Sequence, residues 1–179
     1  MIFEPAPIKD AWVVTLYPYS DERGYFARAF CREEFEAHGI DPAVAQVNTV
    51  FSIRKGTLRG LHYQTEPHAE TKFVRCIRGA IYDMMVDMRP GSPTYLQHFG
   101  TELSAENRRM TFVPENVAHG YLTLAPDTEA CYMVGAPYAA DYELGIRYND
   151  PALGIDWPIP VEVVSDKDTH WPRREGKEV

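Results

Sequence analysis

The chain has 179 residues, of which 45% are hydrophobic, 25% charged and 12% aromatic, and this length and composition predict one folded domain over residues 1–179. Its formal charge of -8 and pI near 5.2 exclude the broad basic surface that nucleic-acid binding requires. The sequence has no run of roughly 18 apolar residues that could cross a membrane and no signal peptide, so we expect a cytoplasmic protein that binds neither nucleic acid nor membrane.

Short strands are predicted along most of the chain. The 14 Pro and 12 Gly residues leave little room for long helices, and the segments between them are rich in β-branched and aromatic residues. Strands of this kind, separated by turns, predict an all-β sandwich or barrel. In chain order the expected strands are Trp12–Tyr17, Ala45–Ser52, Thr57–Gln64, Lys72–Arg78, Ala80–Met88, Tyr95–Leu103, Met110–Val113, Val117–Leu124 and Glu129–Val134.

Helical signals are few. Residues Arg32–His38 predict a short helix with Gly39 as its C-cap, and residues 139–144 predict a short helical turn. Residues 173–179 are rich in charge and are expected to form a solvated or loosely docked tail.

The cysteine pattern favours free thiols. Three cysteines are an odd number, and they lie far apart in the sequence without a CxxC pair. We therefore expect buried thiols at Cys31, Cys76 and Cys131.

The strand predicted at Ala80–Met88 alternates acidic and apolar residues. Asp83 and Asp87 share one face, whereas Met84 and Val86 share the other. Aspartates that point inward would line a polar cavity, and aspartates that point outward would be solvated. The periodicity alone favours neither arrangement.

Reactive side chains gather in two segments. The first is 56–64, which contains Arg59 and His62 and is followed by Lys72. The second is 114–121, which contains His119. The two segments resemble the two motifs of the cupin barrel, in which metal-binding members supply two alternating histidines, a glutamate and a final histidine.

The metal ligands of that pattern are incomplete here. His62 fits the first position and His119 could be the last ligand, but Gln64 replaces the second histidine and no glutamate follows at the right distance. Zinc and non-haem iron usually need three or four protein ligands, so we expect neither a metal nor an organic cofactor.

The groups that remain form an acid–base set. The sequence lacks the GxSxG elbow of hydrolases, the Walker loop of NTPases and the GxGxxG turn of dehydrogenases, so proton transfer is the chemistry still open. A fixed cation, two phenols, an imidazole and its carboxylate partner are available as Lys72, Tyr132, Tyr138, His62, and Asp166 or Asp168.

Most of the chain resembles the bacterial dTDP-4-dehydrorhamnose 3,5-epimerases, which are cupin-type double-stranded β-helices, or jelly-roll barrels, with a few short helices. The matching segments are 21–26, 46–48, 58–64, Lys72, 86–89, 92–94, 118–121, Tyr132, 149–151, 155–158 and 165–168. This resemblance implies an isomerase of deoxysugar biosynthesis that acts as a homodimer on a nucleotide-linked 4-keto-6-deoxy sugar.

The resemblance also implies catalytic roles. His62 would be the base, Tyr132 the acid and Asp168 the carboxylate that orients His62. A ketone at C4 makes the hydrogens on C3 and C5 acidic, and Lys72 would stabilise the resulting enolate oxygen.

Substrate contacts follow from the same resemblance. Phosphate, sugar and base would be bound by Arg23, Phe26, Arg28, Gln46, Asn48, Arg59, His119, Tyr138, Glu143 and Lys167. Of these, Tyr138 would stack on the base, and Arg23 and Arg59 would supply the local positive charge for a diphosphate.

Arg28 departs from the family pattern, because relatives usually have a glutamate there. The nucleotide could therefore be dTDP, GDP or CDP. The sugar could be a 6-deoxyhexose or a heptose. Inversion at C3 alone, isomerisation, and a cupin used for metal chemistry or ligand sensing are the alternatives.

Overall fold

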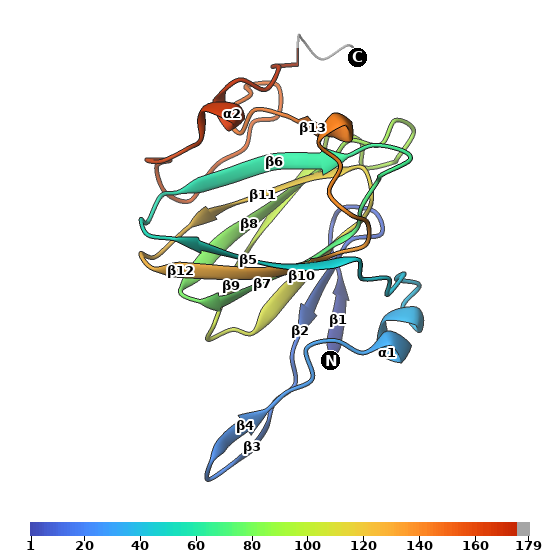
Figure 1. Cartoon of the computed structure of the whole chain (residues 1–179), viewed down its shortest axis with the longest axis vertical. Coiled ribbons are helices and arrows are strands. Elements are labelled where there is room, and N and C mark those ends of the chain that lie inside the picture. Colours follow the sequence, from blue (N-terminus) through green and yellow to red (C-terminus); the bar gives the residue numbers. More distant parts are fainter. Residues whose placement is uncertain (175–179) are drawn as a thin grey trace.

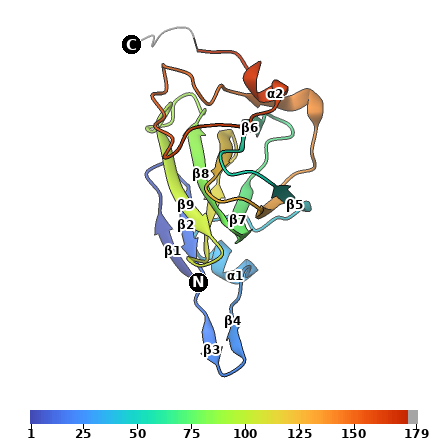
Figure 2. The same cartoon turned by 90° about the vertical axis from the view of Figure 1, so that its left-hand side faces the viewer.

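The computed structural model describes residues 1–174, whose strands form two antiparallel sheets facing each other and one projecting hairpin (Figures 1 and 2). The six-stranded sheet has the order β1 (Ile2–Pro5), β2 (Trp12–Thr15), β10 (Arg109–Val113), β7 (Lys72–Arg78), β12 (Thr128–Val134) and β5 (Gln46–Ser52). The five-stranded sheet has the order β13 (Glu143–Gly145), β6 (Leu58–Gln64), β11 (Val117–Thr123), β8 (Ala80–Asp87) and β9 (His98–Ser104). The hairpin consists of β3 (Tyr19–Asp21) and β4 (Gly24–Phe26). The predicted all-β jelly-roll barrel is confirmed.

All nine predicted strands are present and differ from the expected ranges only at their ends. The sequence did not predict β1, β3, β4 or β13, which have three or four residues each. Strands this short show too few alternations for a period of two to be recognised. The expected turn at 139–144 is a 3₁₀ helix, Ala140–Tyr142, followed directly by β13.

The predicted N-terminal helix is confirmed as α1 (Arg32–Glu36), but its C-cap is Ala37 rather than Gly39. Gly39 lies beyond the cap with a φ of 72°, where its left-handed backbone completes the turn after the helix. A second helix, α2 (Asp166–Thr169), begins after Ser165, whose hydroxyl accepts a hydrogen bond from the Asp168 amide. Across residues 1–174, helices are all too short or too polar to cross a membrane.

Both faces of β8 are covered. Ile81 and Met85 pack inside the barrel, whereas Met84 and Val86 pack outside it against Leu153 and its neighbours from the segment after β13. The two aspartates of this strand are consequently fully buried. The solvated alternative for Asp83 and Asp87 is wrong. Asp83 bonds to His119 beside the cavity, whereas Asp87 accepts hydrogen bonds from residues 89–94, so the inward alternative holds for Asp83 alone.

The three cysteines are free thiols, as expected. Only Cys76 is buried, whereas Cys31 and Cys131 are partly exposed, so the expectation of three buried thiols is wrong for two of them. Cys131 lies on the outward face of β12, next to Tyr132, which points inward.

The start of the charged tail is docked. The backbone amide of Arg174 donates to the Asp150 carboxylate at 2.7 Å, and its guanidinium donates to the Tyr95 hydroxyl at 2.8 Å. The remainder of the predicted tail, 175–179, lies outside the described residues.

A β-bulge in β6 sets which of its side chains point into the barrel. His119 on β11 pairs with His62, but Tyr121 pairs with Arg59, so β6 has one extra residue between these pairs. Gly60 occupies this bulge with a φ of 121°, and a Cβ there would lie 2.5 Å from the Cα of Gly120. Because the bulge shifts the alternation by one position, Arg59 and His62 can face the same side of the sheet.

Replacing Gly60 by alanine tests the close approach of the two strands. The added methyl group would clash with the Gly120 backbone, and alanine is also unfavourable at this positive φ. We therefore expect Gly60→Ala to lower the free energy of unfolding by about 3 kcal/mol. Gly91→Ala is the matched control, because Gly91 also has a positive φ but an open surrounding, and it should lose only about 1 kcal/mol. Urea denaturation followed by circular dichroism measures both, and equal losses would contradict the steric argument.

Candidate functional site

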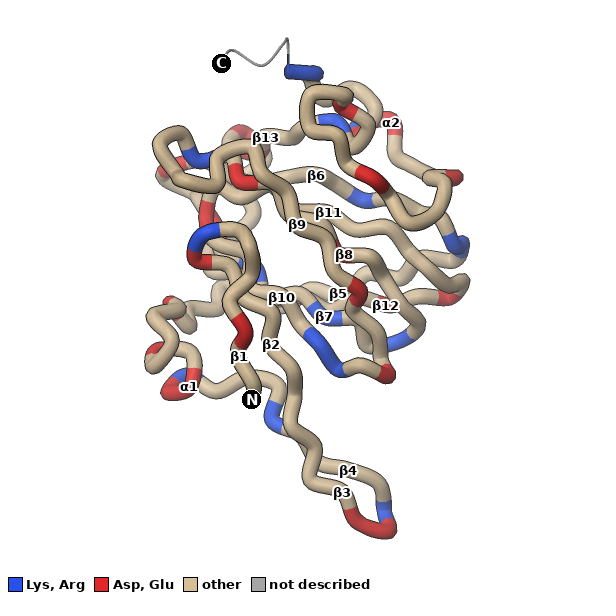
Figure 3. The backbone as a smooth tube through the Cα atoms, turned by 180° about the vertical axis from the view of Figure 1, so that it is seen from behind, with Lys and Arg blue, Asp and Glu red and all other residues tan. Residues whose placement is uncertain are grey.

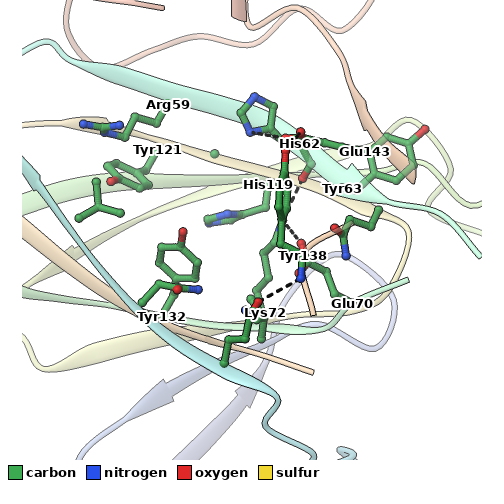
Figure 4. Close-up of a pocket in the computed structure, with 16 residues that line it drawn as sticks. Arg59, His62, Tyr63, Glu70, Lys72, His119, Tyr121, Tyr132, Tyr138 and Glu143 are labelled. Carbon is green, nitrogen blue, oxygen red and sulfur yellow. Dashed lines mark hydrogen bonds and ion pairs between the residues drawn. The ribbon is translucent and has the colours of Figure 1, made fainter. Parts of the chain in front are cut away.

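The two sheets enclose an open cavity of about 470 Å³. The six-stranded sheet contributes one wall and the five-stranded sheet the other, and side chains from both converge in Figure 4. Of the residues predicted from the sequence, those that line the cavity are Gln46, Asn48, Arg59, His62, Lys72, His119, Tyr132, Tyr138 and Glu143.

His62 is held by a carboxylate from the far end of the chain. Its Nε2 lies 2.5 Å from Oδ1 of Asp168, and the Gly60 amide donates to the other oxygen of that carboxylate at 3.3 Å. Burial tends to raise the pKa of Asp168, but the hydrogen bond and charge of His62, together with the hydrogen bonds from Gly60 and Ser165, outweigh it and hold the pKa below its ordinary value. An ionised Asp168 keeps a proton on Nε2 and leaves Nδ1 free to accept one. Asp166, the other carboxylate considered from the sequence, makes no hydrogen bond or ion pair with His62 in the described structure.

The free nitrogen of His62 lies beside a second carboxylate. Nδ1 is 3.6 Å from Oε1 of Glu143, and the other oxygen of Glu143 accepts hydrogen bonds from Tyr138 at 2.7 Å and from Lys167. Burial tends to raise the pKa of Glu143, but the bonds from Lys167 and Tyr138 lower it below its ordinary value. Lys167 does not line the cavity, so it acts on the site through Glu143.

Lys72 reaches the cavity from the opposite sheet. Its Nζ donates to the backbone carbonyl of His62 at 3.2 Å and pairs with Glu70 at 3.0 Å. Both side chains are about nine-tenths buried, so the ammonium is held in one place beside the backbone of His62. Glu70 was not predicted, because it lies just before the strand expected at Lys72–Arg78 and no alternation marks it.

Tyr132 stands on β12, on the wall opposite His62 (Figure 4). Burial raises its pKa above the ordinary value, and the negative charge of Glu70 adds to this effect. A raised pKa keeps the phenol protonated at neutral pH, as a proton donor requires.

His119 is fixed by the buried aspartate of β8. Its Nε2 lies 2.7 Å from Oδ1 of Asp83, and the second oxygen of Asp83 accepts a hydrogen bond from Thr111 at 2.7 Å. Asp83 therefore points inward, an arrangement that the alternation of β8 alone could not predict. Its role is to orient His119, which lines the cavity.

Arg59 supplies positive charge at the cavity wall. Its Nε donates to the Ser52 hydroxyl at 3.2 Å, which directs the guanidinium along β5. Tyr121 lies beside it, and burial raises the pKa of Tyr121 to about 12. The Tyr121 hydroxyl is buried without a hydrogen-bond partner in the described structure, and the sequence motif that contains this residue did not predict a functional role for it.

Three predicted substrate contacts lie away from this cavity. Arg23 and Phe26 belong to the projecting hairpin, where Arg23 pairs with Asp21 and the Phe26 side chain is exposed. Arg28 follows the hairpin and pairs with Glu34 at 3.5 Å. Figures 1 and 2 place the hairpin at the end of the molecule opposite α2. One chain thus does not bring these side chains to the cavity.

The residues of the cavity do not fit a metal. The amide of Gln64 donates to the carbonyls of His68 and Pro137 and accepts from the Ala139 amide, so its oxygen is already used. His62 and His119 are each paired with an aspartate. Within 1–174, groups of three or more His, Cys, Asp or Glu side chains arranged to hold an ion are absent.

Comparisons with known proteins all match the same family over nearly the whole chain. The family model described as dTDP-4-dehydrorhamnose 3,5-epimerase matches residues 5–175. A protein of Sinorhizobium fredii with that name is 42% identical over 173 residues, covering 96% of this chain and 89% of that protein. A dTDP-4-dehydrorhamnose 3-epimerase of Streptomyces niveus is 36% identical over 169 residues, covering 94% and 81%. The crystal structure of a dTDP-4-dehydrorhamnose 3,5-epimerase from Bacillus anthracis with TDP and PPi bound superposes with a TM-score of 0.93 at 38% identity, covering 97% of this chain and 99% of that one.

The ionised Asp168 makes the stability of the fold depend on pH. Because the folded pKa is lower than the unfolded one, the carboxylate stabilises the fold above the unfolded pKa, and this contribution is lost as pH falls through the folded pKa. Urea denaturation from pH 7 to pH 3 should show the native protein more stable than Asp168→Asn at pH 7, with the difference shrinking below roughly pH 4. A difference that stays constant over this range would contradict the arrangement.

Proposed function

The chain belongs to the dTDP-4-dehydrorhamnose 3,5-epimerase family, and from this membership we propose that its cavity inverts C3 and C5 of a dTDP-linked 4-keto-6-deoxy sugar. The protein is an isomerase acting on a nucleotide sugar. The observation that carries the proposal for the site is the pairing of a carboxylate-held His62 on one wall with a protonated Tyr132 on the other and Lys72 between the sheets.

The first step is proton removal by His62. A ketone at C4 acidifies the hydrogens on C3 and C5, because the electron pair left on carbon moves into an enolate with its charge on oxygen. Nδ1 accepts the proton, and Asp168 and Glu143 stabilise the imidazolium that results.

Lys72 stabilises the enolate. Its ammonium is fixed by Glu70 and by the His62 carbonyl, so it needs no reorganisation when charge develops on the oxygen. The interaction is stronger with the enolate than with the neutral ketone, and only such a difference accelerates the reaction.

Tyr132 returns a proton to the opposite face of the carbon. Delivery from the other wall inverts the centre, whereas return from His62 would regenerate the original configuration. The same pair serves C3 and C5 if the sugar shifts between two positions, so sugar placement decides whether one centre or two are inverted.

The rest of the cavity is proposed to bind the nucleotide. Arg59 would meet the diphosphate, Gln46, Asn48 and His119 would contact sugar and phosphate, and Tyr138 would stack on the base. Lys167 would act through Glu143, which it holds at the cavity wall. An arginine suits a diphosphate because its donors form a planar fork, and this local charge opposes the negative charge of the whole chain.

A homodimer is proposed to complete the site. The hairpin exposes Tyr19 and Phe26 to 68%, and β5 is an edge strand with Phe51 and Val47 exposed on its outer side. Exposed aromatic residues and an open apolar edge favour association. A second copy would cover them and could bring Arg23, Phe26 and Arg28 of one hairpin to the cavity of the other chain.

Deuterium incorporation tests the chemistry. In heavy water the protein should introduce deuterium at C3 and C5 of a dTDP-4-keto-6-deoxy sugar, detected by NMR and mass spectrometry. We expect His62→Ala to lower exchange at both carbons by at least about 100-fold, and Tyr132→Phe to retain exchange but slow inversion. Exchange at C3 alone would select the 3-epimerase reaction, and a fully active His62→Ala would refute the base. Parallel reactions with GDP- and CDP-linked substrates test whether Arg28 changes the base.

Subunit mixing tests the trans arrangement. Arg23→Glu and His62→Ala should each be inactive alone, because each dimer then lacks either the cation or the base in both sites. After unfolding and refolding together in equal amounts, half of the dimers contain one chain of each kind. Such a dimer has one site with native His62 and a native hairpin, so about one quarter of the native activity should return. A mixture that stays inactive would place the hairpin in its own chain's site.

A further inference from the structure

Trp171 lies against the proposed base without lining the cavity. Its ring centroid is 5.7 Å from that of His62 with an interplanar angle of 60°, an edge contact between the two rings. The residue follows α2, the helix that carries Asp168, and Figure 1 shows this segment beside β6. The same short segment therefore contacts His62 through both a carboxylate and an indole.

The indole is seated directly on the backbone of β13. A Cβ at Gly145 would lie 2.3 Å from an atom of the Trp171 ring, so only glycine leaves room for the side chain at that position. Gly145 is also the residue that pairs with His62 across the β13–β6 ladder. Trp171 thus covers the strand position next to the imidazole.

Other contacts hold the segment in this place. The Arg147 side chain donates to the Trp171 carbonyl at 2.9 Å, and the Lys167 ammonium lies 5.7 Å from the indole ring centre. The indole N–H is buried without a hydrogen-bond partner in the described structure. A buried donor without a partner is unfavourable, so polar contacts of the indole do not explain its position, whereas its packing on Gly145 and His62 does.

We infer that Trp171 is a positioning residue for His62: seated on Gly145, it fixes α2 so that Asp168 stays on Nε2 and it limits rotation of the imidazole. This inference rests on the proposed role of His62 as the base. A base must be within hydrogen-bond reach of the hydrogen it removes, and small displacements from that geometry cost large factors in rate.

The test uses Trp171→Ala, Trp171→Phe, Gly145→Ala and the double variant Gly145→Ala/Trp171→Ala in the full-length protein. Trp12→Ala is the matched control, because Trp12 is also partly buried and makes an edge contact to another histidine, His38, at 5.5 Å. Deuterium exchange gives kcat and KM. Long-range ¹H–¹⁵N NMR of the protein without substrate, at a pH where the imidazole is neutral, gives the tautomer of His62.

We expect Trp171→Ala to lower kcat for exchange by roughly 10- to 100-fold, with KM changed less than about two-fold because the nucleotide contacts remain. The NMR spectrum should change from a single Nε2-protonated tautomer to a mixture. Trp171→Phe should retain one tautomer and most of the activity. Gly145→Ala should resemble Trp171→Ala, and the double variant should be no worse than either single variant, because the clash disappears with the indole.

Three results would overturn the inference. One is an unchanged tautomer and kcat in Trp171→Ala, another is an equal loss of kcat in Trp12→Ala, and the third is additive losses in the double variant. A native protein that shows the Trp171-dependent tautomer but no exchange would refute the proposed function and leave the positioning role intact. If the native protein catalyses exchange but the His62 tautomer does not depend on Trp171, the positioning role is refuted and the proposed function stands.

Discussion

The hydrogen bond between His62 and Asp168 joins residues 106 positions apart, and much of the molecule is arranged so that it forms. The bulge at Gly60 turns His62 into the barrel and also places an amide on the Asp168 carboxylate. Ser165 caps the helix that carries Asp168, and β13 beside His62 provides the bare backbone on which Trp171 rests. A strand irregularity, a helix cap and an edge strand thus all determine the geometry of one imidazole.

The sequence predicted the barrel because its long strands alternate regularly, and it predicted His62, Lys72, Tyr132 and Asp168 because they lie in motifs of a family. It did not predict β13 or α2, since three or four residues carry no period, although Ser165 followed by Asp168 is a capping signal. Glu70 and Trp171 were missed for a different reason. Their roles arise from contacts with residues on other elements, and no local pattern marks them.

Positive charge lies at the cavity wall of a protein whose net charge is negative and therefore unfavourable for an anionic ligand. Lys and Arg positions are scattered among Asp and Glu positions along the chain (Figure 3), and the net charge is negative. Four acidic side chains in or behind the cavity wall are each paired: Asp168 with His62, Asp83 with His119, Glu70 with Lys72 and Glu143 with Lys167. These pairs fix the cationic and imidazole groups in orientation, while Arg59 adds positive charge at the wall for an anionic ligand.

Because β5 lies at the edge of its sheet, the side chains that shape the cavity on this strand are separate from those that orient His62. This strand has one neighbour, β12, and lines the cavity with Gln46, Asn48 and Val50. The groups that orient His62, the proposed base, lie on β6, β13 and α2, on the other wall. Changes in β5 disturb one set of cross-strand pairs and leave the base untouched. Substitutions of the inward side chains of β5 are therefore expected to change which sugar fits the cavity without moving the His62–Asp168 pair.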